Sequence, residues 1–171
     1  MAFKVLLLLT ILLSNALSYA NPSPIGLELD KSNLSDLTKK YTIIKKQPNH
    51  WDGYNYNIDV KDIQLENISS ALIICNDQEV IQAVILSIKK HKFQEFYDML
   101  ANKYTVKEKN IPFVGNKLAI FTDDQCTIIL DAPHLDFDME LAYITNEFFK
   151  KFNDKSDKER KQKKDKVKEL L

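Results

Sequence analysis

The chain has 171 residues, with 24 acidic and 24 basic side chains that cancel at neutral pH, and it contains only three glycines. Because Gly26, Gly53 and Gly115 are far apart, the sequence excludes the glycine-rich phosphate loops of nucleotide-binding proteins. We therefore expect no cofactor.

The first twenty residues have the three regions of a secretory signal peptide. Lys4 precedes an apolar run from Val5 to Leu13, and the small residues Ser18 and Ala20 lie three and one positions before the expected cleavage point. The run is shorter than the roughly 18 to 20 residues that span a bilayer. We expect residues 1–20 to be removed, which leaves an exported protein, periplasmic or extracellular, without stable membrane insertion.

A ten-residue segment recurs 63 positions further along the chain. Residues 37–46 return as residues 100–109, and six of the ten positions agree or nearly agree. Self-similarity at a fixed spacing is typical of a duplicated supersecondary unit. We therefore predict a first helix-and-sheet repeat over residues 21–88 and a second over residues 89–152.

The first repeat is predicted to contain a short helix and four strands. Leu34, Leu37 and Tyr41 form the apolar stripe of the helix, and Asp30 or Ser32 is its expected N-cap. Alternation of polar and apolar residues, clearest from Tyr54 onward, predicts strands. The four strands are expected at residues 42–47, 53–60, 69–76 and 79–88.

The second repeat has the same predicted order. Aromatic and aliphatic residues spaced three and four apart, from Phe93 to Tyr104, predict a helix over residues 89–103. Short connections between the strands that follow favour antiparallel neighbours. These strands are expected at residues 105–109, 116–122, 125–131 and 138–145.

A last helix is predicted to begin at Thr145 or Asn146 and to dock through Phe148, Phe149 and Phe152. Residues 153–171 form a charged tail, helical or frayed, because they offer little apolar surface to bury. Residues 150–171 hold ten basic against five acidic side chains. The interspersed acids argue against a polyanion partner, so we expect no nucleic acid.

The predicted fold class is thus α+β, in which two tandem helix-plus-four-strand antiparallel units form a sheet packed by helices, with a C-terminal helix. This order resembles the beta-lactamase inhibitor protein family, and each half is similar to the small exported BamE-like modules of bacterial envelopes. The glycine-containing entry at residues 24–32 is also similar to the starts of such modules. In those families the sheet presents a surface to another protein, so the resemblance implies binding without catalysis.

Cys75 and Cys126 are the only cysteines. In an oxidising compartment such a pair favours a disulfide, which would stabilise the fold by about 2 to 4 kcal/mol. The alternative is that both are small buried apolar side chains.

Two further groups of residues are candidate sites. Asp131, His134, Asp136 and Asp138 form the densest cluster of metal-ligating or acid-base side chains, although aspartate and histidine are also common in connections between strands. Residues 50–56 form the richest aromatic patch. Its candidate partner-binding side chains are Trp51, expected at the rim, and Tyr54 and Tyr56, expected to point inward.

The leading functional hypothesis is a non-catalytic exported module that binds another envelope or secreted protein through its sheet. A metal-dependent or acid-base hydrolase that uses residues 131–138 is one alternative. A carrier that holds a small apolar ligand between helices and sheet is another.

Overall fold

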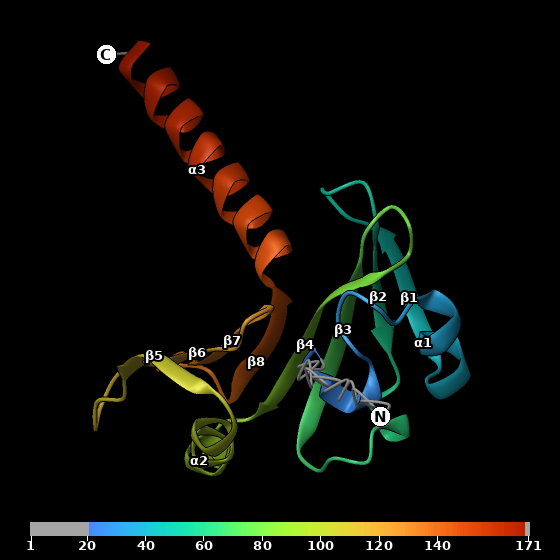
Figure 1. The fold of residues 1–171 in the computed structure, drawn as a ribbon. Helices are drawn as coiled ribbons and strands as arrows, with labels where there is room; N and C mark the ends of the chain where they lie inside the picture. Colours follow the sequence, from blue (N-terminus) through green and yellow to red (C-terminus); the bar gives the residue numbers. More distant parts are fainter. Residues whose placement is uncertain (1–20, 170–171) are drawn as a thin grey trace, which may run out of the picture.

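The computed structural model describes residues 21–169, so the predicted signal peptide lies outside the described residues. Within this part of the chain the fold is α+β, as predicted: eight strands form one antiparallel sheet in the order β1-β2-β3-β4-β8-β7-β6-β5, with three α-helices (Figure 1). Strands β4 and β8 meet at the centre of the sheet, and β1 and β5 are its edges.

The elements of the first half are α1 (Leu34–Lys40), β1 (Ile43–Pro48), β2 (Tyr54–Ile58), β3 (Ile68–Cys75) and β4 (Ile81–Lys89). The second half contains α2 (Phe93–Lys103), β5 (Thr105–Asn110), β6 (Lys117–Thr122), β7 (Cys126–Ala132) and β8 (Asp138–Thr145). Each strand begins and ends within two residues of its predicted bounds. The helix α3 (Asn146–Glu169) begins where it was predicted and stands away from the sheet (Figure 1).

The predicted N-cap of the first helix is wrong, because the cap is Asn33. The side chain of Asn33 accepts hydrogen bonds from the backbone N–H groups of Ser35 and Asp36, and Asp36 accepts one from the N–H of Asn33 in return. Both predicted caps have other partners: the Ser32 hydroxyl accepts the Glu28 N–H, and Asp30 accepts the amide of a β4 glutamine. This capping box places α1 beside β1.

The two faces of the sheet are covered differently. Alternate residues of each strand point to opposite faces, and one face packs against α1 and α2. This helix-covered face holds the main core, whose members include Leu37 and Leu100 from the helices and Ile73, Leu86, Leu130 and Leu141 from the strands. The opposite face, here called the groove face, contacts α3 through a second cluster that contains Ile74, Ala83 and Phe148.

Both edge strands contain an irregularity of register close to their first residue. In β1 the shift falls between Ile43 and Lys45, and in β5 it falls between Val106 and Glu108. In a β-bulge one strand contributes an extra residue, which increases the local twist. The two edges of the sheet are therefore distorted at corresponding points.

Candidate functional site

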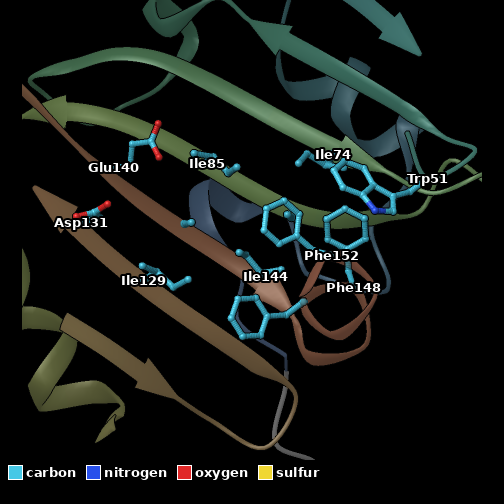
Figure 2. Close-up of a pocket in the computed structure, with 12 residues that line it drawn as sticks. Trp51, Ile74, Ile85, Ile129, Asp131, Glu140, Ile144, Phe148 and Phe152 are labelled. Carbon is cyan, nitrogen blue, oxygen red and sulfur yellow. The ribbon is translucent and has the colours of Figure 1, made fainter. Parts of the chain in front are cut away.

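A groove of about 270 Å³ lies between the groove face and the base of α3 (Figure 2). Its floor comes from the central strands and its end wall from aromatic side chains of α3 and of the loop between β1 and β2. The lining side chains are Trp51, Ile74, Ala83, Ile85, Ile129, Asp131, Glu140, Ala142, Ile144, Phe148, Phe149 and Phe152.

The strand register explains why the floor is apolar. Ile85 of β4 lies opposite Ala142 of β8, and Ala142 lies opposite Ile129 of β7. Two residues further along these strands, and therefore on the same face, Ala83 of β4 lies opposite Ile144 of β8. Side chains at opposing positions point to the same face, so these residues form one continuous apolar surface across three strands.

The position of Trp51 is set by Asn49. The Asn49 Oδ1 atom accepts the backbone N–H groups of Trp51 (2.9 Å) and Gly53 (3.0 Å), and its Nδ2 donates to the Cys75 carbonyl (3.0 Å). Gly53 is required here, because a Cβ atom on it would lie 2.0 Å from the carbonyl oxygen of Cys75. The loop is thereby held tightly against the end of β3.

Trp51 packs against α3. Its ring lies edge-on to the Phe148 ring, with 5.2 Å between the ring centroids, and 5.7 Å from the Phe152 ring. One turn further, the Lys155 ammonium donates a hydrogen bond to the His50 carbonyl at 2.8 Å. Trp51 therefore anchors α3 within the chain and also forms part of the groove wall.

A chain of hydrogen bonds, buried at Thr145 and reaching the surface at Asp30, fixes the start of α3. The Thr145 hydroxyl accepts the backbone N–H of Phe148 and donates to Gln82, and the Gln82 amide donates to Asp30. A threonine whose oxygen accepts the third amide of a helix is an N-cap. The end of β8, strand β4 and the N-terminal segment thus together determine where α3 leaves the sheet.

The end of the groove away from the aromatic residues is acidic. Asp131 of β7 lies directly opposite Glu140 of β8, and both line the groove (Figure 2). Like charges at opposing positions of an antiparallel pair destabilise the sheet. A cationic group bound between them would relieve this repulsion.

The three predicted partner-binding aromatics are separated by the structure. Trp51 lines the groove, whereas Tyr56 is fully buried in the main core and burial raises the pKa of its hydroxyl. Tyr54 is partly exposed beyond the core, where the Lys46 ammonium lies 3.9 Å from its ring centroid.

The structure does not bring together the four residues of the predicted metal or acid-base cluster. Asp131 belongs to the groove, while His134 and Asp136 are exposed in the next loop. The Asp138 carboxylate pairs with the Lys89 ammonium at 2.8 Å, which lowers the pKa of Asp138. Across residues 21–169, no group of three or more histidine, cysteine, aspartate or glutamate side chains is arranged to hold a metal ion.

Of the two alternatives for the cysteines, the structure has the second: Cys75 and Cys126 are both free and buried, and no disulfide joins them. They lie on β3 and β7, with β4 and β8 between them. Three strand spacings of about 4.8 Å place their α-carbons about 14 Å apart, well beyond the roughly 7 Å that a disulfide allows. Burial raises the pKa of each thiol to about 12.

Sequence reasoning missed Glu140 and the aliphatic residues of the groove floor. The signal that could have found them is the nearly unbroken apolar run from Ile81 to Ile88, since a strand covered on both faces does not alternate. Such a run indicates that the second face of β4 is also shielded.

Comparison with protein-family models, with curated proteins and with solved structures finds no match. In the described part of the chain, no helix has the length and apolar character needed to cross a membrane.

Proposed function

We propose that the protein is an exported, non-catalytic binding module that receives an apolar segment of another protein in the groove beside α3. The observation that carries this proposal is the incomplete cover of the groove face. The helix-covered face is closed by α1, α2 and the N-terminal segment, whose Leu27 and Leu29 are fully buried. On the groove face, in contrast, Ile85, Ile129 and Ile144 retain contact with solvent.

The charge of the groove limits the chemistry of the partner. A segment that lays aliphatic or aromatic side chains on Ile85 and Ile129 would carry its next residues to Asp131 and Glu140. A lysine or arginine at that point would be placed between two carboxylates. We therefore propose a segment with an apolar anchor followed by a basic residue, bound in the way that amphipathic segments enter hydrophobic grooves.

We also propose that the fold arose by duplication of a helix-plus-four-strand unit. The register shifts of β1 and β5 support this, because Ile43 and Lys45 correspond to Val106 and Glu108 at the same 63-residue spacing as the sequence repeat. The extended residue that ends each helix, Tyr41 after α1 and Tyr104 after α2, has this spacing too.

Selection of phage-displayed random peptides on the full chain tests the binding proposal. We expect enriched peptides that combine aromatic or aliphatic residues with lysine or arginine. Ala142→Phe fills the centre of the groove without removing any contact, so it should raise the Kd of a synthesised peptide at least about tenfold. Thr105→Phe, on the same face but outside the groove, is the matched control and should leave the Kd unchanged.

The acidic end has its own control. Asp131→Asn combined with Glu140→Gln should weaken peptide binding, whereas Glu108→Gln, which removes an exposed charge outside the groove, should not. Peptides whose binding is insensitive to Ala142→Phe would contradict the proposal. A different result would instead support a carrier of a small apolar ligand: the chain binds no peptide, it binds the neutral dye N-phenyl-1-naphthylamine, and Ala142→Phe abolishes the dye binding.

A further inference from the structure

Four large apolar side chains project into solvent from two neighbouring loops. Phe113 is fully exposed and Val114 is 68% exposed in the loop between β5 and β6. Leu135 and Phe137, in the loop between β7 and β8, are 89% and 90% exposed. Monomeric soluble proteins rarely expose such a cluster unless it contacts something. We call these four residues the apolar tips.

Hydrogen bonds hold both loops in place and join them. Lys117 at the start of β6 lies opposite Ala132 at the end of β7, so the two loops leave the sheet at the same end. The Asn116 Oδ1 atom then accepts the backbone N–H of His134 at 2.7 Å. The Lys90 ammonium donates to the carbonyls of Pro133 and His134, and the Lys90 N–H donates to the Phe137 carbonyl. These bonds fix the backbone of the loop between β7 and β8 and join it to the residue before β6, while the apolar tips remain exposed.

The apolar tips are remote from the groove end at which α3 begins. They adjoin the first residue of β8, whereas α3 follows its last residue, Thr145. An antiparallel strand of eight residues is about 24 Å long. The apolar tips thus adjoin the acidic end of the groove, at Asp131 and Glu140, and not its aromatic end.

Positively charged side chains lie beside the apolar tips, on the side of the sheet that α2 covers. The Lys117 ammonium lies 5.4 Å from the Phe93 ring centroid, and the Lys109 ammonium lies 4.6 Å from the Tyr97 ring centroid. With Lys90 they form a basic rim, and none of the three has an ion-pair partner among the side chains that the structure describes. Lys109 and Lys117 lie against aromatic rings of α2, as lysines do where apolar surface meets water, whereas the Lys90 ammonium is bonded to the carbonyls of the loop between β7 and β8.

We propose that the apolar tips and the basic rim form a peripheral contact with an anionic lipid bilayer. The four side chains are 68% or more exposed, and a bilayer can surround side chains that project this far without a matching pocket. Apolar side chains beside lysines match the boundary between acyl chains and anionic headgroups. The surface shares no residue with the lining of the proposed peptide groove, although it adjoins the acidic end of that groove.

The carboxylate that lies between two of the apolar tips opposes the contact and provides a test of it. Asp136 is exposed between Leu135 and Phe137, where it would face the anionic headgroups. Asp136→Asn should therefore raise the affinity for anionic vesicles, by about fivefold for one charge near the surface. This direction of change distinguishes a lipid surface from a basic protein partner, which the same substitution would weaken.

A fluorophore attached to the apolar tips tests the proposal directly. Phe113→Cys can be labelled with a nitrobenzoxadiazole dye in the full chain, because the two native thiols are buried. Vesicles of phosphatidylcholine with about one-quarter phosphatidylglycerol should shift the emission to the blue and intensify it. The same dye on Ser35→Cys, an exposed position in α1, should not respond.

Substitutions complete the test. Leu135→Ser combined with Phe137→Ser should lower vesicle affinity at least about tenfold. Ile44→Ser, which removes a 65% exposed side chain on the far edge strand, should leave it unchanged. A dye at position 113 that stays in water while the chain binds vesicles would overturn the proposal, since another part of the chain would then make the contact. Equal losses from Ile44→Ser, or no binding at all, would overturn it too.

Discussion

The attachment of α3 to the sheet depends mainly on Phe148, so we predict that Phe148→Ala releases the helix. The Phe148 side chain is 6% exposed and lies edge-on to Trp51. Burial of one phenylalanine ring contributes about 2 to 3 kcal/mol and the edge-to-face contact about 1 kcal/mol more. Because the site adjoins an open groove that can admit water, we expect a total loss of about 3 kcal/mol, at the low end for such truncations.

The hydrogen bonds of Thr145 and Asn146 keep the first residues of α3 attached, but the contacts further along the helix are too weak to replace Phe148. Phe152 is 47% exposed, and the hydrogen bond from Lys155 to the His50 carbonyl is at the surface. Each contributes about 1 kcal/mol or less. We therefore expect α3 to separate from Trp51 and the groove face beyond its first residues while the sheet itself remains folded.

Trp51 is the only tryptophan, so its fluorescence reports this separation. In Phe148→Ala we expect red-shifted emission, stronger quenching by acrylamide and a lower helical signal in far-ultraviolet circular dichroism. Phe152→Ala is the matched control and should shift the emission only slightly. The reasoning would be refuted if Phe148→Ala had the emission maximum and acrylamide quenching of the wild type. It would also be refuted if the midpoint of global unfolding fell while the fluorescence of Trp51 in the folded protein stayed the same.

Three other outcomes are expected. Cys75 and Cys126 should resist Ellman's reagent at pH 8 in the native protein and both react after denaturation. Burial raises the pKa of each thiol to about 12, so as pH rises the thiols lose their protons in the unfolded chain before they do so in the folded protein. Denaturant titrations should therefore show a free energy of unfolding that falls between about pH 9 and pH 12. The fall should reach up to about 1.4 kcal/mol per pH unit for each thiol. Thr145→Val removes the N-cap of α3 and should cost about 1 to 2 kcal/mol of unfolding free energy in urea, whereas Thr145→Ser should retain most of it. The Thr42 N–H donates a hydrogen bond to the Asp62 carboxylate and lowers the pKa of that carboxyl. At neutral pH, Asp62→Asn should therefore have a lower free energy of unfolding than the wild type. The difference should vanish in acid, where the wild-type carboxylate is protonated.

The individual elements could be predicted because their signals are local. The alternation around Tyr54 and Tyr56 produces β2, and the spacing from Phe93 to Leu100 produces α2. The order of the strands could not be predicted in the same way. The pairing of β4 with β8 joins Ile85 to Ala142, and neither residue carries a local sign of its partner.

The candidate site was only partly predictable for the same reason. Trp51 stands out as the single tryptophan, but its contact with Phe148 depends on where α3 leaves β8. Asp131 was grouped with its sequence neighbour His134, whereas the sheet places it opposite Glu140. The strand β7 ends at Ala132, so His134 lies in the loop beyond the sheet while Asp131 stays on the groove face, and closeness in sequence does not give closeness in the site.

The outermost strands have a consequence for how the molecule can associate. An open sheet of this width has two free borders that could template pairing with further chains and lead to aggregation. Here both borders are rich in lysine, with Lys45 and Lys46 on β1 and Lys107 and Lys109 on β5, and each is bent by its register shift. Charge and bending at both borders therefore discourage a strand of another molecule from pairing there, which limits growth of the sheet from one molecule to the next.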